Sequence, residues 1–149
     1  MRQPDLSDLK LARQYMADAY LAIEAGEFNM ERFPNVAINR AYYSLFYACH
    51  AALTLRGLHP SSHEGVHNMI SKEYVKDGTL PKEIPSILAG LEQRRINADY
   101  LPREVYKPEE ARHHLDRAIK AVKQIHNHLL ELYPDVFKPE TLNQPYEGS

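Results

Sequence analysis

One stretch, residues 39–54 within the run NVAINRAYYSLFYACHAALTLRG, constrains the fold of this chain more than any other. When the run is placed on an α-helix at about 100° per residue, apolar side chains cover roughly half of the circumference. The apolar positions are Ile38, Ala41, Tyr42, Leu45, Phe46, Ala48, Cys49, Ala52, Leu53 and Leu55. A helix with so wide an apolar face packs against neighbours on several sides. The pattern therefore predicts a central helix of a helical bundle.

The other side of the same helix carries hydrogen-bonding groups rather than the charges of an ordinary solvent-facing surface. These groups recur three or four residues apart, so they form one line along the helix. They are Asn39, Arg40, Tyr43, Tyr47, His50 and Thr54. We interpret the first five as candidate binding residues.

Helix start and stop signals divide the first half of the chain. Asp5 or Ser7 is a suitable N-cap for a first helix that runs to about Ala25. Pro34 suits the first turn of the central helix, which we expect to end near Arg56. Ser61 and Glu64 then form a capping-box pattern that opens a short helix reaching about residue 76.

Prolines mark the beginnings of two later helices. Pro81 starts one of them, and Pro108 leads the last, which has the most regular apolar stripe in the chain. From Tyr133 onward three prolines occur without any periodicity, so we expect a domain over residues 1–133 and a tail over 134–149. The sequence predicts an all-α fold, an antiparallel up-and-down bundle of four main helices with a short additional helix.

Arg95 is the anomaly of the helix that starts at Pro81. It continues the apolar stripe of Ile84, Ile87, Leu88 and Leu91, where an unpaired guanidinium is very costly. Asp99, one turn later, is the nearest candidate partner. Arg95 and Asp99, together with Arg94, Asn97 and Tyr100, make a second polar group in addition to the one on the central helix. Two such groups favour a cleft in which an arginine holds a phosphate while tyrosine and asparagine side chains contact bases.

Composition limits the classes of function. The chain has 149 residues and a net charge of −2, with 8 Lys and Arg against 5 Asp and Glu in residues 94–130. This local surplus of positive charge is compatible with phosphate binding, but by itself it is too small to predict nucleic-acid binding. No apolar run approaches the roughly 20 residues of a membrane span, and no signal peptide is recognisable, so we expect a cytoplasmic protein. A single cysteine, Cys49, excludes a disulfide within the chain.

The segment HEGVH, from His63 to His67, matches the HExxH pattern of zinc proteases. It falls on the first turn of a short helix, contains Gly65, and has no predicted strand beside it to align a peptide substrate. We therefore interpret it as a coincidence or a capping segment, and expect no zinc. Walker, GxSxG and CxxC motifs do not occur, so no cofactor is expected.

Two motifs carry a resemblance to a known family. The segment RAYYSLFY, Arg40 to Tyr47, and the segment RINADY, Arg95 to Tyr100, resemble the small prokaryotic HEPN proteins with RAYYxxFY and RxxADY motifs. SHEGV and KDGTLP, which lie between them, are also similar. The resemblance covers roughly residues 6–130 and implies an all-α bundle, a homodimer and a small nucleotidyltransferase partner in a toxin–antitoxin-like module.

The resemblance leaves two functions open. Many HEPN domains are metal-independent ribonucleases that use an Arg followed four to six residues later by His, but Tyr100 occupies that place after Arg95. A tyrosine with a pKa near 10 is a poor base at neutral pH. The chain is therefore expected to bind RNA or a nucleotide as a partner of a nucleotidyltransferase. The alternative is an endoribonuclease whose base is Tyr100 or His50.

Overall fold

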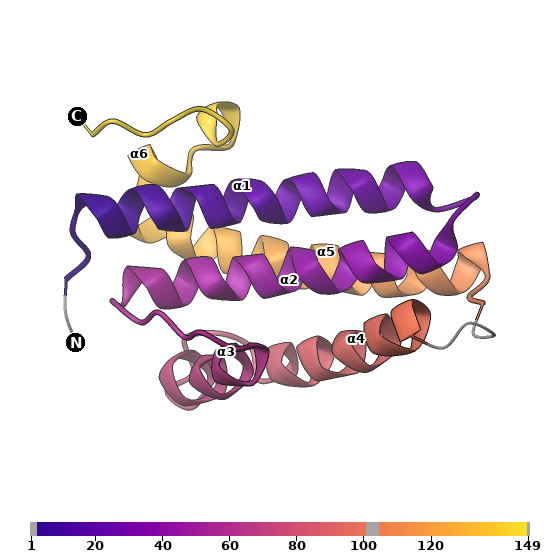
Figure 1. Cartoon of the computed structure of the whole chain (residues 1–149). Helices are drawn as coiled ribbons and strands as arrows, with labels where there is room; N and C mark the ends of the chain where they lie inside the picture. Colours follow the sequence, from indigo (N-terminus) through magenta and orange to yellow (C-terminus); the bar gives the residue numbers. More distant parts are fainter. Residues whose placement is uncertain (1–2, 101–104, 149) are drawn as a thin grey trace.

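The computed structural model describes residues 3–100 and 105–148, and within these ranges every regular element is a helix. Four long helices alternate in direction: α1 (Leu6–Asn29), α2 (Pro34–Leu55), α4 (Glu83–Tyr100) and α5 (Pro108–Leu132) (Figure 1). The short α3 (His63–Ile70) continues into a π-helical turn, Ser71–Val75, between α2 and α4. The predicted all-α up-and-down bundle is confirmed. No helix in the described part of the chain is long and apolar enough to cross a membrane.

Helix α2 is the centre of the bundle because it packs against α1, α3, α4 and α5. Its apolar side chains, including Ile38, Leu45 and Leu53, are fully buried. The hydroxyl-bearing Tyr42 is buried completely as well, although a buried phenol requires hydrogen-bond partners. The wide apolar face of α2 therefore contacts several neighbouring helices. Part of the polar line of α2 also lies between helices.

The helix boundaries follow the predicted signals with three differences. Asp5 caps α1 through a reciprocal pair of hydrogen bonds with Asp8, but the helix runs on to Asn29 instead of ending near Ala25. Gly26 lies within this helix, and its missing side chain leaves room for Leu115 of α5. Pro34 and Pro108 begin α2 and α5 as expected.

The other two differences concern where the short helix α3 and the helix α4 begin. Ser62, not Ser61, caps α3: its hydroxyl accepts a hydrogen bond from the Gly65 amide at 2.9 Å, so Glu64 is not part of a capping box with Ser61. Helix α4 begins at Glu83, two residues after Pro81, and contains Pro85 in its first turn, where no amide donor is needed.

Residues 134–148, expected as a tail, pack back onto the bundle. They form α6 (Pro134–Phe137), a 3₁₀ turn (Pro139–Thr141) and an extended end that lies along α1 (Figure 1). Val136, Phe137 and Leu142 are buried, and Arg13 of α1 donates hydrogen bonds to the carbonyls of three residues of this segment. The segment is thus a packed part of the structure, while the proposed domain boundary at residue 133 stays a prediction.

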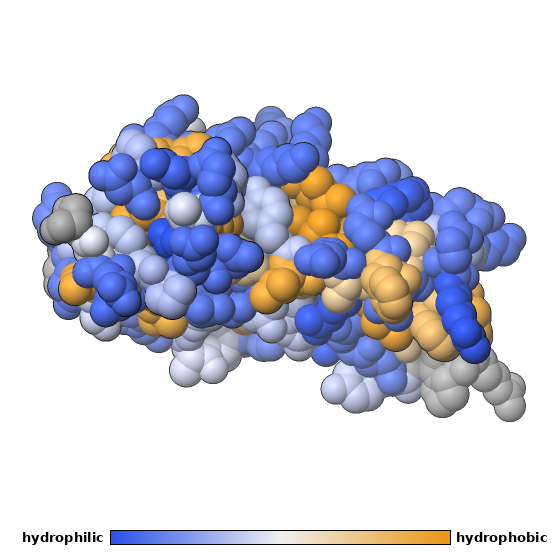
Figure 2. Space-filling model, turned by 90° about the horizontal axis from the view of Figure 1, so that it is seen from above, coloured by the Kyte–Doolittle hydropathy of each residue, from blue (hydrophilic) through white to orange (hydrophobic). Residues whose placement is uncertain are grey.

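The face that carries this segment is mostly hydrophilic. Figure 2 views the molecule from that side and shows an apolar area in the middle of the face, beyond the C-terminal segment. Leu21 and Phe28 are the most exposed large apolar side chains of α1, at 57% and 88%. The candidate binding residues lie elsewhere, on α2 and α4.

Candidate functional site

Arg95 points from α4 onto the rings of two neighbouring tyrosines of α2. Its guanidinium carbon lies 5.2 Å from the centre of the Tyr42 ring and 5.7 Å from that of Tyr43. One terminal nitrogen lies 3.9 Å from the Asp99 carboxylate, and the side chain is only 12% exposed. The expectation that Arg95 leaves bulk solvent and meets Asp99 is confirmed. Stacking on aromatic faces also compensates for the loss of water around the cation.

A second arginine, Arg40, also lies near the Tyr43 ring. The guanidinium carbon of Arg40 is 5.1 Å from the Tyr43 ring centre, and its Nε donates to the Asn39 side-chain oxygen at 2.9 Å. The Asn39 amide donates in turn to Asp99 at 3.0 Å. We call these five residues, Asn39, Arg40, Tyr43, Arg95 and Asp99, the Arg95 cluster. It contains two guanidinium groups and one carboxylate.

The remaining α2 candidates, Tyr47 and His50, have different neighbours. The ring of Tyr47 lies 5.8 Å from that of Tyr43 and continues the aromatic surface. His50 instead stacks on Tyr15 of α1, with ring centres 4.3 Å apart. Burial lowers the pKa of His50, so its imidazole favours the neutral form. The structure therefore brings Tyr47, but not His50, next to the cluster.

The other α4 candidates lie on the outer surface. Arg94 is exposed, and it adds to the burial that lowers the pKa of His114 on α5, which places it toward α5. Asn97 accepts a hydrogen bond from Gln93 at 3.0 Å. Tyr100 is 70% exposed and shows no contact with the cluster among the described residues. Of the ten predicted site residues, five form the Arg95 cluster and Tyr47 lies beside it, whereas the other four lie elsewhere.

Sequence reasoning missed a second polar group directly beside the cluster. The Tyr42 hydroxyl donates to the Glu92 carboxylate at 2.9 Å, and it lies 2.7 Å from His63 Nδ1 and 3.2 Å from His67 Nε2. Both histidine nitrogens also lie 3.5 Å from the same Glu92 oxygen. We call Tyr42, His63, His67 and Glu92 the tyrosine network. The i, i+4 spacing of the two histidines in HEGVH was the available signal.

The tyrosine network also shifts proton affinities. Burial, followed by the hydrogen bond to Glu92, raises the pKa of Tyr42 far above its usual value, so the hydroxyl keeps its proton. Burial lowers the pKa of His67. Among the described residues no group of three or more His, Cys, Asp or Glu side chains is arranged to hold a metal ion. The absence of zinc stays a prediction.

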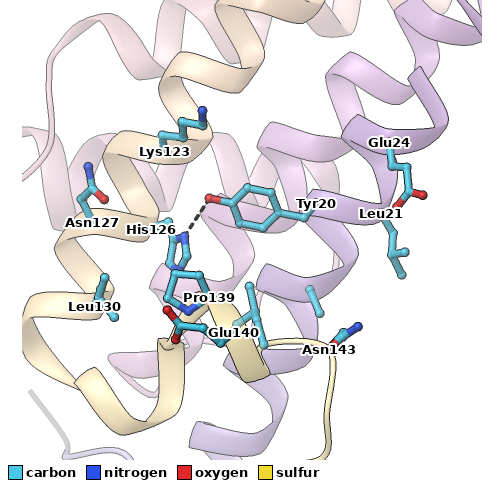
Figure 3. A pocket seen from close by; sticks show the side chains of 12 residues that line it. Tyr20, Leu21, Glu24, Lys123, His126, Asn127, Leu130, Pro139, Glu140 and Asn143 are labelled. Carbon is cyan, nitrogen blue, oxygen red and sulfur yellow. Dashed lines mark hydrogen bonds between the residues drawn. The ribbon is translucent and has the colours of Figure 1, made fainter. Parts of the chain in front are cut away.

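A further hollow lies away from all of these residues. It has a volume of about 540 Å³ between α1, α5 and the C-terminal segment, and its floor contains the 2.7 Å hydrogen bond between Tyr20 and His126 (Figure 3). His126 Nε2 contacts the Phe137 carbonyl oxygen at 2.8 Å, which ties the floor to the C-terminal segment. No predicted site residue lines this hollow.

Comparison with known proteins agrees with the two motifs on which the resemblance rests. The model of the HEPN domain family matches residues 9–132, which include the Arg95 cluster and the tyrosine network. The chain belongs to the HEPN family. The matched range ends at α5, so the C-terminal segment lies outside the part of the chain that matches the HEPN model.

Several curated relatives match part of the chain. A Methanocaldococcus jannaschii protein named "Putative toxin MJ0142" is 35% identical over 98 residues, which are 64% of this chain and 66% of that protein. UPF0332 proteins of Thermotoga maritima and Pyrococcus horikoshii are 36% and 34% identical over 60% and 50% of this chain. The matches span 63% and 48% of those two proteins, so each relative is matched over about two thirds of its length or less.

Proposed function

We propose that this HEPN protein is a toxin-like module that binds RNA, or a nucleotide, through the Arg95 cluster. The observation that carries the proposal is that the guanidinium carbons of Arg40 and Arg95 both lie near the Tyr43 ring, 5.1 Å and 5.7 Å from its centre. Asp99 lies 3.9 Å from the Arg95 guanidinium, and the nearby Glu92 carboxylate is hydrogen-bonded to Tyr42. Guanidinium groups donate charge-assisted hydrogen bonds to phosphates, and a partly exposed aromatic ring is a stacking surface for bases.

The names of two relatives support the toxin-like role. Both are Methanocaldococcus jannaschii proteins, the one described above and a second named "Putative toxin MJ0605", which is 32% identical over 60% of this chain. The resemblance to the RAYYxxFY and RxxADY branch adds a small nucleotidyltransferase as a proposed partner. Co-elution of the two proteins in size-exclusion chromatography tests that partnership, and separate elution at micromolar concentrations speaks against it.

A homodimer is part of the proposal. The half-buried Tyr43 and Tyr47 leave aromatic surface on α2 that a two-fold partner would cover, and such pairing would bring two Arg95–Tyr100 segments toward one groove. Light scattering distinguishes the monomer from the dimer, because a single species of 17.2 kDa at working concentration contradicts the dimer.

The binding proposal is tested with a short 5′-fluorescein-labelled single-stranded RNA and with ATP. Arg40→Gln is the first variant, and Arg95→Gln is the second; both side chains are partly buried. We expect each to weaken RNA binding roughly tenfold, since a charge-assisted contact to phosphate is lost. Lys123→Ala, which removes an exposed charge from α5, is the control.

Fluorescence anisotropy gives the affinities, and circular dichroism verifies that each variant is helical and melts cooperatively. The proposal fails if folded Arg40→Gln and Arg95→Gln proteins bind both RNA and ATP as the parent does. In that case Arg95 serves packing alone. Binding should also weaken as salt is raised, because phosphate contacts release counterions.

Cleavage of the bound RNA is the second candidate function. The proton acceptors considered from sequence, Tyr100 and His50, lie on an exposed surface and against α1, respectively. His63, by contrast, contacts the same two tyrosine rings as Arg95, at 5.7 Å and 5.9 Å. This observation keeps cleavage as a candidate.

A further inference from the structure

The Tyr42 hydroxyl has one proton and two lone pairs, and the tyrosine network uses all three. An ionised carboxylate only accepts hydrogen bonds, so the tyrosine proton goes to Glu92, 2.9 Å away. His63 Nδ1 and His67 Nε2, which both face the Tyr42 oxygen, must then donate hydrogen bonds to it. His63 therefore carries its proton on Nδ1, and His67 carries its proton on Nε2.

This assignment leaves His63 Nε2 as an unprotonated nitrogen. The reverse tautomer would set the Nδ1 lone pair against a tyrosine oxygen at 2.7 Å and a carboxylate oxygen at 3.5 Å, so the network opposes it. No partner for Nε2 occurs in the part of the chain that the structure describes. The His63 side chain is 40% exposed, whereas that of His67 is 17% exposed.

Packing holds the His63 ring in one orientation. It stacks on Phe46 of α2, with ring centres 4.5 Å apart and planes inclined by 24°. The stack and the Tyr42 hydrogen bond come from successive turns of one buried helix. A base fixed in this way loses little freedom when it receives a proton.

His63 and Arg95 lie on the same tyrosines. The Tyr42 ring centre is 5.7 Å from the His63 ring and 5.2 Å from the Arg95 guanidinium, and Tyr43 is 5.9 Å and 5.7 Å from the same two groups. The His63 imidazole and the Arg95 guanidinium therefore share the same pair of tyrosine rings. The three helices α2, α3 and α4 build this arrangement.

We propose that His63, oriented by Tyr42 and Glu92, is the proton acceptor for cleavage of single-stranded RNA bound at the Arg95 cluster. This inference rests on the proposed RNA-binding function. His63 Nε2 removes the proton of a ribose 2′-hydroxyl, O2′ forms a bond to phosphorus, and the bond from phosphorus to O5′ breaks. The departing O5′ takes a proton from water, and the hydroxide that remains is neutralised by the proton that His63 Nε2 then releases. The products are a 2′,3′-cyclic phosphate and a 5′-hydroxyl.

Glu92 is a positioning residue in this scheme. Its carboxylate, 3.5 Å from His63 Nδ1, stabilises the imidazolium that forms when Nε2 takes the proton. Arg40 and Arg95 supply positive charge for the phosphorane-like transition state. Each group therefore acts through a position that the structure already fixes.

The test compares two histidine replacements chosen by atom position. In His63→Asn the amide nitrogen replaces Nδ1, which preserves the donor to Tyr42 and removes the Nε2 base. In His67→Gln the amide nitrogen replaces Nε2, which preserves the other donor. The full chain is incubated with labelled single-stranded RNA in EDTA, and an RNA with 2′-deoxy sugars serves as the uncleavable probe for affinity.

We expect His63→Asn to lower the cleavage rate by about 100-fold or more, the usual contribution of a general base, while affinity for the 2′-deoxy probe changes little. His67→Gln should lose less than about tenfold. A purely structural network predicts equal losses for both variants. In His63→Ala, added imidazole should restore part of the rate, which a packing defect would not allow.

The outcomes separate the two proposals. If the parent binds RNA but leaves it intact, or if His63→Asn cleaves at the parental rate, the assignment of His63 is wrong and the binding function stands. If the parent does not bind RNA or ATP, both proposals fail. A product lacking a cyclic phosphate also overturns the step written above.

Discussion

Two helix glycines show how strongly the effect of one methyl group depends on its surroundings. A Cβ atom on Gly26 of α1 would lie 3.1 Å from Leu115 Cδ2, whereas one on Gly90 of α4 would meet no atom within 4 Å. Replacing glycine by alanine inside a helix stabilises it by about 0.5–1 kcal/mol when space is available. We expect that gain in urea unfolding of Gly90→Ala and a smaller gain or a loss for Gly26→Ala. Equal gains would contradict the close packing at Gly26.

The same dependence on surroundings explains which site residues the sequence revealed. Arg95 was predictable because it interrupts an apolar stripe, and Asp99 because it lies one turn later on the same helix. The partners of Tyr42 were not, since His63 and Glu92 are 21 and 50 residues away along the chain. Local periodicity contains no information about such distant pairs. The HEGVH segment was recognised in the sequence, but it was compared with a metal-binding motif, and its hydrogen bonds to Tyr42 were not predicted.

At the scale of elements, the C-terminal segment depends on one buried side chain. Arg13 of α1 is 5% exposed and donates to the carbonyls of Val136, Thr141 and Gln144. We expect Arg13→Met to lower the free energy of unfolding by about 2–4 kcal/mol, because buried carbonyls lose their donors. The segment 134–148 should then become sensitive to limited proteolysis. Lys10→Met, an exposed change on the same helix, is the control, and equal protection in both variants would contradict this dependence.

The long helices were predictable from sequence, and the docking of this segment was not, for a physical reason. Helices α2 and α5 bury side chains at regular spacing, which a 3.6-residue period reveals. The segment is held instead through backbone carbonyls, which every residue has, and through Val136, Phe137 and Leu142 at irregular intervals. Its prolines indicate where helices stop but not where the chain goes next.

At the scale of the whole molecule, partly buried histidines couple stability to pH. Burial lowers the pKa values of four histidines on α2, α3 and α5, namely His50, His67, His114 and His128. Unfolding returns each to a pKa near 6.5, so below about pH 6.5 the unfolded chain binds more protons than the folded one. Acidification through this range must therefore destabilise the fold.

We expect the melting temperature followed by circular dichroism to fall between about pH 7 and pH 5.5, by roughly 2–4 °C for each kcal/mol lost in a domain of this size. Glu27, whose pKa is lowered by its hydrogen bond to Arg112, loses its contribution only below about pH 4.5, so its effect falls in a separate range. His67→Gln should flatten the slope, because glutamine keeps the donor to Tyr42 but does not titrate. A melting temperature that is constant or rises on acidification would show that these imidazoles accept protons as readily in the folded bundle as in the unfolded chain.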